Sequence, residues 1–420
     1  MRSELDAPER DVYVWVWLPG STAPVSAGVL APRGNRFVFR YGRSYRANPA
    51  AMAISGLELP LGPDPIEPRT GLALAGCLAD AMPDAWGQRV ILHRHLHGAT
   101  VHHDTNELPI TTYLLESGAD RFGAIDFQRS PTEDVERSTA ATLEQLRRAA
   151  DLLEAGELLP APLDDALLHG SSIGGARPKA LLRVGSRCLI AKFGSRHDTT
   201  SVVKAEAVAM NLARRVGLTV APTEIARSLG HDVLLVERFD RTPDGGRRAV
   251  VSALSLLGLD ALTGGRYATY YDLADVIRAH FAQPAATLRE LYARIVFNIL
   301  VGNTDDHARN HAAFWDGREY ALTPAYDLCP QTRSGGEAVQ AMAIGRDGYR
   351  FSQFAGCIPA ASTYLLERSD AIAIVTHQLD VVHAEWAAAA DEVGLTAAER
   401  ARLLGRSILN PFALEGWPPR

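Results

Sequence analysis

Alternating and helical patterns of apolar residues divide the chain into two β-rich regions and a largely helical last third. Alternating or apolar runs bounded by turn residues predict strands, and apolar residues spaced by three and four predict helices. The predicted strands are 12–18, 37–39, 180–184, 188–193 and 233–236. The predicted helices are 71–95, 143–153, 203–216 (with Gly217 as its C-terminal cap) and 288–300. The polar segment 130–139 is predicted to be a linker.

The clearest predicted helix is 288–300, which leads into the polar segment described below. Its apolar face consists of Leu288, Leu291, Tyr292, Ile295, Val296, Ile299 and Leu300. Thr287 and Glu290 are predicted to form a capping box at its start.

Length and composition indicate a globular protein with more than one core. The 420 residues predict two or three packed units. The formal net charge of −6 argues against nucleic-acid binding by the whole chain, although a local basic patch stays open. The N-terminus lacks the apolar segment of a secretory signal, and the four cysteines show no metal-ligand or disulfide spacing. We therefore expect a cytoplasmic protein.

A polar segment begins where the apolar pattern of the helix stops. It contains Asp305 and, five positions later, Asn310. Asp316-Gly317 lies between two apolar runs and predicts a hairpin with a type I′ turn, after which Asp327 follows. Phosphoryl transfer from ATP requires a carboxylate near the attacking hydroxyl and oxygen ligands for magnesium. The segment can supply both, in the order that protein kinases use.

A simpler interpretation is that these polar groups only cap and solvate the end of a helix. The hairpin and the aspartate beyond it lower the weight of that interpretation. Asp306 is a competing candidate for the base because it is adjacent to Asp305. His307 is predicted to support the loop by hydrogen bonding.

Lys192 and Glu206 are candidates for the lysine and glutamate of an ATP site. Lys192 lies on a predicted apolar strand, where alternation puts it on the face opposite Leu189, Ala191 and Phe193. Glu206 lies near the start of the next helix. An exposed edge lysine is the alternative role for Lys192.

A glycine-rich segment, 170–179, precedes the strand with Lys192. It contains Ser171, Ser172, Gly174 and Gly175. Glycines allow backbone amides to approach phosphate oxygens, and the position predicts a phosphate-covering loop. The Walker spacing is absent, and a flexible linker is the alternative.

Taken in order, these motifs resemble the HipA family of toxin kinases. The matching segments are SSIGGARPK, LIAKF, LLVERFDR, NTDDHARN and LTPAYD, and LADAMPDAWGQRVI resembles the HipA amino-terminal part. The resemblance implies an α+β, protein-kinase-like bilobal fold with an extra N-terminal subdomain. The expected divisions are 1–130 for that subdomain, 140–240 for the kinase N-lobe and 241–420 for the helical C-lobe.

The resemblance also implies roles for single residues. Asp305 would be the catalytic base, and Asn310 and Asp327 would bind magnesium. Lys192 would contact the phosphates of ATP, and Glu237 and Phe239 would lie at the adenine hinge. Ser172 would be autophosphorylated, with the adjacent Ser171 as a competing acceptor.

The family further implies a growth-arrest toxin with a helix-turn-helix antitoxin that carries most of the operator DNA binding. An aminoacyl-tRNA synthetase would be the protein substrate. Three alternatives stay open from the sequence. They are a catalytically silent kinase-fold corepressor or scaffold, a small-molecule kinase, and a metal-dependent hydrolase built on Asp305, Asp306 and His307.

Overall fold

The computed structural model describes residues 10–96, 108–134, 141–170, 177–195, 198, 200–333 and 335–418. The chain forms two compact units that each combine several segments. Unit 1 comprises residues 1–197, 226–251 and 315–318, and unit 2 comprises 198–225, 252–314 and 319–420. The division into three domains expected from the sequence stays a prediction.

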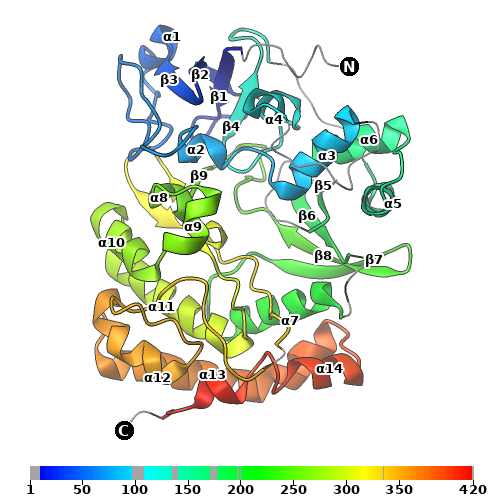
Figure 1. The fold of residues 1–420 in the computed structure, drawn as a ribbon, viewed down its shortest axis with the longest axis vertical. Helices are drawn as coiled ribbons and strands as arrows, with labels where there is room; N and C mark the ends of the chain where they lie inside the picture. The colour runs from blue at the N-terminus through cyan, green and yellow to red at the C-terminus, as the bar shows by residue number, and fades with distance from the viewer. Residues whose placement is uncertain are drawn as a thin grey trace. The chain divides into compact units, whose positions relative to one another are not determined.

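The first sheet of unit 1 has the strand order β3-β2-β1-β4 (Figure 1). Strand β1 runs antiparallel to both of its neighbours, β2 and β4. Its strands are β1 Val12–Val16, β2 Val25–Arg33, β3 Arg36–Tyr41 and β4 Ile125–Gln128. The predicted strands at 12–18 and 37–39 correspond to β1 and β3. The sequence patterns missed β2, since its Gly28 and Pro32 are residues that weaken a strand signal.

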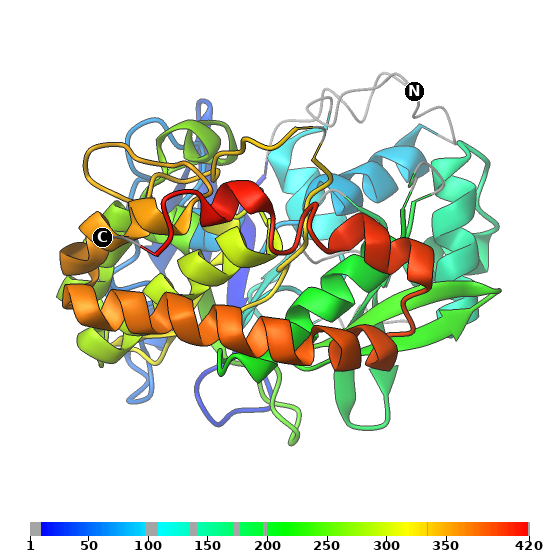
Figure 2. The ribbon, with the colours of Figure 1, turned by 90° about the horizontal axis from the view of Figure 1, so that it is seen from below.

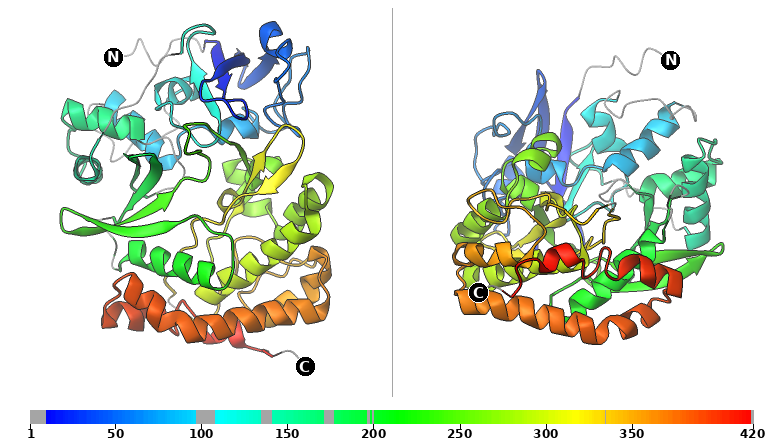
Figure 3. Two further views of the ribbon diagram at one scale, coloured as in Figure 1. Left: turned by 180° about the vertical axis from the view of Figure 1, so that it is seen from behind. Right: turned by 60° about the horizontal axis from the view of Figure 1, so that its bottom comes forward.

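A second sheet has the strand order β5-β6-β8-β7 (Figure 3, left). Lys192 lies on its strand β6. Its strands are β5 Lys179–Val184, β6 Arg187–Phe193, β7 Thr223–Ser228 and β8 His231–Glu237. Helices α3, α5 and α6 share a buried core with β5, β6 and β8 that includes Trp86, Leu146 and Phe193. The helices and the remaining strand of unit 1 are α1 Arg43–Arg46, α2 Gly76–Ala79, α3 Ala85–His95, α4 Ile110–Glu116, α5 Leu143–Glu154, α6 Ala161–Gly170 and β9 Ala249–Ser252.

One predicted helix of unit 1 was wrong in its extent. The region 71–95 contains two helices, α2 and α3, rather than a single one. Pro83 lies between them, and proline disfavours helical backbone in the residue before it. Asp84 then starts α3 as its N-cap, with its side chain accepting a hydrogen bond from the Gly87 amide at 2.8 Å.

Unit 2 is mostly helical and is organised around α11, whose residues are buried from Ile295 to Val301. The long helix α13 packs against both α7 and α11 (Figure 2). The helices of this unit are α7 Val202–Arg215, α8 Ala253–Leu256, α9 Ala261–Tyr267, α10 Tyr270–His280, α11 Pro284–Val301, α12 Phe354–Cys357, α13 Arg368–Glu392 and α14 Ala397–Leu403. Short 3₁₀ helices are η2 Ala308–Asn310, η3 Ile358–Tyr364 and η4 Pro411–Leu414, and the strands are β10 Ala312–Trp315 and β11 Tyr320–Leu322.

The predicted capping box at the start of the 288–300 helix is wrong. Helix α11 begins at Pro284, so Thr287 already lies inside it. Proline suits the first helical position because its missing amide hydrogen would have no partner there. The carboxylate of Glu290 instead accepts hydrogen bonds from Arg294 and from the Thr219 amide.

The predicted hairpin is confirmed, but its type I′ turn is wrong. Strands β10 and β11 are joined by four residues, 316–319. Positive φ occurs there only at Gly317 (+96°), whereas a type I′ turn requires two such residues. The Asp316 carboxylate accepts a hydrogen bond from the Arg318 amide at 2.8 Å, which stabilises the longer turn.

The four cysteines are free thiols. Among the described residues, no helix is both long and apolar enough to cross a bilayer.

Candidate functional site

The candidate catalytic loop starts at a fixed point, the C-terminal end of α11. Gly302 ends this helix in the left-handed conformation, with φ of +71°. A Cβ atom at this position would lie only 2.5 Å from the carbonyl oxygen of Ser407, so only glycine fits. The Gly302 carbonyl oxygen also accepts a hydrogen bond from the Gln331 amide at 3.0 Å. The chain therefore leaves the buried helix along one defined path.

Asp306 is enclosed directly beyond that point. It is only 1% exposed, and one of its carboxylate oxygens accepts three hydrogen bonds. The donors are the Tyr270 hydroxyl at 2.6 Å, the Asn298 amide nitrogen at 2.7 Å and His311 Nε2 at 2.8 Å. A carboxylate with these partners holds the loop in place and has no free face for a substrate hydroxyl. The structure thus argues against Asp306 as the base.

Asp305 has the opposite environment, since its side chain is exposed. Partial desolvation and the nearby carboxylates of Asp327 and Asp306 raise the pKa of Asp305, while His307 acts to lower it. A raised pKa makes the Asp305 carboxylate a better proton acceptor than an ordinary surface aspartate.

Asn310 is held against the start of the same loop. Its side chain is 8% exposed, and its amide nitrogen donates to the backbone oxygen of Asp305 at 3.4 Å. The Asn310 backbone amide donates to the His307 carbonyl oxygen at 2.8 Å. The expected hydrogen-bonding support from the His307 side chain is not seen at Nδ1, which is enclosed without a partner. The backbone oxygen of His307 supports the loop through its bond with the Asn310 amide.

Asp327 has an unusual backbone for a residue other than glycine. Its φ is +61°, in the left-handed region, and such strained residues concentrate at functional sites. Two bonds fix the segment before it, from the Ala325 amide to the Thr219 oxygen (2.8 Å) and from the Ala221 amide to the Ala325 oxygen (3.0 Å). The Tyr326 hydroxyl donates to the Arg309 oxygen at 2.7 Å and so links this segment to the loop.

The side chains of this site fit a magnesium ion better than a transition metal. Asp327 and Asn310 offer a carboxylate and an amide oxygen, which are the hard ligands that magnesium prefers. The described residues contain no group of three or more His, Cys, Asp or Glu side chains placed to hold a metal. The burial of Asp306 and its three hydrogen bonds argue against the hydrolase alternative built on Asp305, Asp306 and His307.

Lys192 lies on β6, one of the two inner strands of its sheet, and is paired with Lys179 of β5 and Leu234 of β8. The predicted alternation is confirmed, because Leu189, Ala191 and Phe193 are buried while Lys192 is partly exposed. Glu206 is buried in α7, at 5% exposure. Lys192 belongs to unit 1 and Glu206 to unit 2, and their pairing stays a prediction.

The other candidate residues are Glu237, Phe239 and the glycine-rich segment. The Glu237 carboxylate forms an ion pair with Arg187 at 3.2 Å, and the Phe239 ring is partly exposed. Ser171, Ser172, Gly174 and Gly175 lie outside the described residues. Their roles stay predictions.

Sequence reasoning missed two buried polar groups that shape these regions. Asn298 interrupts the apolar face of α11, and this break in the pattern was the available signal. Lys179 is 4% exposed, and its ammonium lies 3.3 Å from the Asp84 carboxylate. No local pattern predicts that pair, because the two residues are 95 positions apart.

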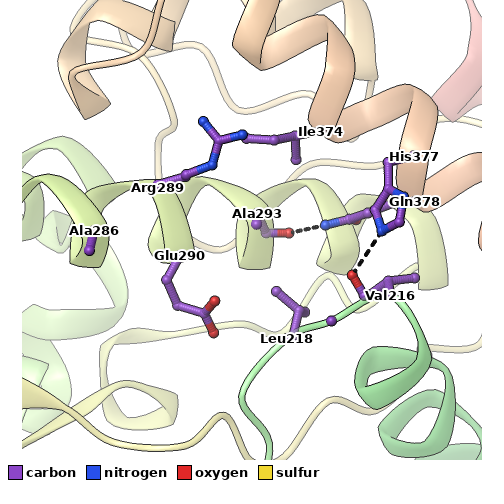
Figure 4. Close-up of a pocket in the computed structure, with 10 residues that line it drawn as sticks. Val216, Leu218, Ala286, Arg289, Glu290, Ala293, Ile374, His377 and Gln378 are labelled. Carbon is purple, nitrogen blue, oxygen red and sulfur yellow. Dashed lines mark hydrogen bonds between the residues drawn. The ribbon is translucent and has the colours of Figure 1, made fainter.

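A separate cavity of about 310 Å³ lies elsewhere in unit 2, next to α11 and α13 (Figure 4). Gln378 donates to the Ala293 oxygen at its wall, and His377 bonds the Val216 oxygen. None of the predicted site residues lines it.

Comparison with known proteins gives two family matches. Residues 171–393 match the model of the HipA-like C-terminal domain, and residues 16–128 match that of the HipA N-terminal domain. The protein Y4mE of Sinorhizobium fredii is 30% identical over 45% of this chain and 54% of its own length. The serine/threonine-protein kinase toxin HipA of Shewanella oneidensis is 29% identical over 33% of this chain and 36% of its own length. The chain thus aligns with about half or less of these relatives.

A solved structure supports the fold. The HipA chain from the complex of Shewanella oneidensis HipA, HipB and operator DNA superposes with a TM-score of 0.64. It covers 90% of this chain and 92% of that one, at 21% sequence identity. The expected α+β, kinase-like fold is therefore confirmed. Because the C-terminal family model alone spans more than half of the sequence, the chain belongs to the HipA-like family.

Proposed function

We propose that this protein is an ATP- and magnesium-dependent serine/threonine protein kinase that acts as a HipA-type toxin. The observation that carries the proposal is the arrangement in unit 2. There Asp305 is exposed, the adjacent Asp306 is buried and anchored, and Asp327, which follows the hairpin, has a left-handed backbone. Family membership and the kinase toxin among the relatives agree with it.

In this proposal, each site residue has a separate task. Asp305 accepts the proton of the substrate hydroxyl at its carboxylate, and its raised pKa favours that role. Asn310 and Asp327 hold magnesium, which when bound would neutralise charge on the phosphates. Lys192 binds phosphate oxygens as a point charge, and Glu206 orients its ammonium.

The remaining residues hold the nucleotide from other sides. The segment with Glu237 and Phe239 binds the adenine base. Gly174 and Gly175 belong to a loop that covers the phosphates, since glycine backbones can approach phosphate oxygens closely.

Autophosphorylation on Ser172 or Ser171 would regulate the enzyme in this proposal. A phosphate adds about −1.5 to −2 charges near neutral pH. Repulsion between that charge and the phosphates of ATP would favour a displaced loop and an inactive kinase. Phosphosite mapping tests this step. It compares the wild type with the Ser171→Ala and Ser172→Ala single variants and with the double variant.

The biological part of the proposal is growth arrest by phosphorylation of a host protein. An aminoacyl-tRNA synthetase is the proposed substrate. A helix-turn-helix antitoxin is the proposed partner, and it would carry most of the contact with operator DNA. The solved HipA structure from Shewanella oneidensis is a complex with HipB and operator DNA from a toxin–antitoxin system, which supports the proposal of an antitoxin partner.

The deciding experiment is phosphotransfer from labelled ATP to proteins of a host lysate, in the presence of magnesium. We expect one or a few labelled proteins, identified by mass spectrometry as phosphorylated on serine or threonine. The Asp305→Asn variant should label nothing, and the control variant Asp316→Asn, in the exposed hairpin turn, should behave like the wild type. Nucleotide binding without any transfer would instead support the corepressor alternative, and transfer only to small molecules would support the small-molecule kinase.

A further inference from the structure

The segment at the end of β8 alternates between partly exposed and buried residues. Arg238 and Asp240 are buried, at 5% and 2% exposure, whereas Glu237 and Phe239 are partly exposed. Glu237 is the last residue of β8, and Phe239 and Asp240 form a turn directly after it. Each of the two proposed adenine-binding residues is therefore followed directly by a buried charged residue.

Those ions are bound by a single loop, residues 120–123, that lies more than a hundred positions earlier. The Asp120 carboxylate accepts hydrogen bonds from Arg238 at 2.9 Å and from Arg241 at 2.6 Å. The Gly123 amide donates to the Asp240 carboxylate at 2.7 Å. Backbone oxygens of the loop complete the set, with bonds from Arg238 to Arg121 (2.6 Å) and from Arg241 to Gly123 (2.9 Å).

The charges in this contact depend on one another. Burial alone would raise the pKa of Asp240 and Asp120, but the charges of Arg238 and Arg241 lower the pKa of both carboxyl groups. Burial alone would also lower the pKa of Arg238, and the same two aspartates raise it. Loss of one partner would leave a buried charge uncompensated, which is strongly unfavourable. The segment is therefore held in one position.

The loop also reaches the aromatic ring of the segment. Phe122 and Phe239 meet edge to face, with ring centroids 6.1 Å apart. Gly123 has a φ of +75°, and a Cβ there would lie 3.2 Å from the Val250 amide nitrogen. The loop thus packs closely against the chain on both sides of the ion cluster.

Both partners of this contact belong to unit 1, but they match different family models. The loop lies within the part matched as the HipA N-terminal domain, and the segment 238–241 lies within the HipA-like C-terminal domain. We propose that the loop Asp120–Gly123 positions the segment Glu237–Phe239 for the nucleotide base, so that the N-terminal domain forms part of the nucleotide site. This inference rests on the proposed kinase function.

The test compares the affinity for Mg·ADP with that for inorganic tripolyphosphate, which has no base, by calorimetry on the full-length protein. The variants are Asp120→Asn, which removes a charge, and Phe122→Leu, which removes only the ring. We expect affinity for ADP to fall about three- to tenfold while affinity for tripolyphosphate stays unchanged.

The control variant is Glu58→Gln. Glu58 is another buried carboxylate of unit 1, whose oxygens accept from the Gly76 and Cys77 amides. The Glu58→Gln variant should keep the wild-type ratio of affinities for Mg·ADP and tripolyphosphate, even if the substitution lowers the melting temperature. Phe122→Leu keeps the test decisive if Asp120→Asn does not fold.

If a folded Phe122→Leu protein binds ADP with the wild-type ratio of affinities for Mg·ADP and tripolyphosphate, this inference is overturned, whereas the proposed kinase function still stands. Absence of nucleotide binding by the wild type would overturn the proposed function and this inference with it.

Discussion

The Asp306 carboxylate accepts a hydrogen bond of 2.6 Å from the hydroxyl of Tyr270, and both side chains are buried. This bond helps to give two adjacent aspartates different environments, because it holds Asp306 in the interior while Asp305 is exposed. Burial and the Asp306 charge raise the pKa of the Tyr270 hydroxyl well above its usual range, so it remains a donor at any physiological pH.

Asp305→Asn should abolish phosphotransfer while the protein stays folded and still binds nucleotide. The substitution keeps the shape of the side chain but removes the proton acceptor, and loss of general-base catalysis costs about 10²–10⁴-fold in rate. Single-turnover transfer from labelled ATP measures the rate, and calorimetry measures binding. Wild-type transfer by Asp305→Asn would show that the base is another group.

Asp306→Ala should unfold the protein more easily, by about 2–5 kcal/mol, because Tyr270, Asn298 and His311 would lose their buried acceptor. Urea denaturation followed by circular dichroism gives the free energy of unfolding. Tyr270→Phe removes one of the three donors and should lower the free energy of unfolding by a smaller amount. A stability of Asp306→Ala equal to that of the wild type would contradict the anchoring role.

Removal of the carboxylate charge should change Tm in opposite directions at Asp305 and Asp120, and both changes should depend on pH. The pKa of Asp305 is raised in the folded protein, so its ionised form disfavours folding at neutral pH, and Asp305→Asn should raise Tm there. The pKa of Asp120 is lowered, so its ionised form favours folding above the usual aspartate pKa, and Asp120→Asn should lower Tm at neutral pH.

The difference in Tm between each variant and the wild type should shrink as the pH falls. The Asp305 difference should vanish below the usual aspartate pKa of about 4, where the carboxyl is protonated in both states. The Asp120 difference should diminish as the pH falls below that value towards its lowered folded pKa. Thermal melts between neutral and acidic pH, without metal, measure both. Equal differences at all pH values would show that the charges do not cause them.

Gly302→Ala and Gly217→Ala form a matched pair at two helix ends. Both glycines have positive φ, which costs alanine about 1–2 kcal/mol. A Cβ added at Gly217 would meet open space, whereas a Cβ at Gly302 would lie 2.5 Å from the Ser407 oxygen. We expect Gly302→Ala to be the more destabilising in urea denaturation and to reduce phosphotransfer. Equal effects on both measurements would mean that the contact with Ser407 relaxes freely.

Lys192→Ala should weaken ATP use, because a positive charge on the phosphates is lost. The expected change is a higher KM for ATP, measured by initial rates at several ATP concentrations. Lys204→Ala is the control, since the Lys204 ammonium bonds the Gly394 oxygen and pairs with Glu399 in the C-terminal helical region. Normal KM in Lys192→Ala would make Lys192 a simple strand residue.

The sequence alone determined features that depend on local chemistry. Alternation on β6 correctly placed Lys192 on the face opposite Leu189 and Ala191, because successive side chains of a strand point to opposite sides. The apolar spacing in 288–300 identified α11, and the change to polar residues located the loop with Asp305 and Asn310. The order of the motifs indicated the family, which the comparisons confirmed.

Only the tertiary structure decided which of two neighbouring aspartates is enclosed. Asp305 and Asp306 have the same chemistry, and their difference comes from packing that brings Tyr270, 36 positions away, to Asp306 together with the nearer Asn298 and His311. The contact between Asp120 and Arg238 was equally hidden, because its partners are 118 residues apart and no periodicity links them. Buried polar groups choose their partners by the packing of the whole chain, whereas strands and helices follow from the order of neighbouring residues.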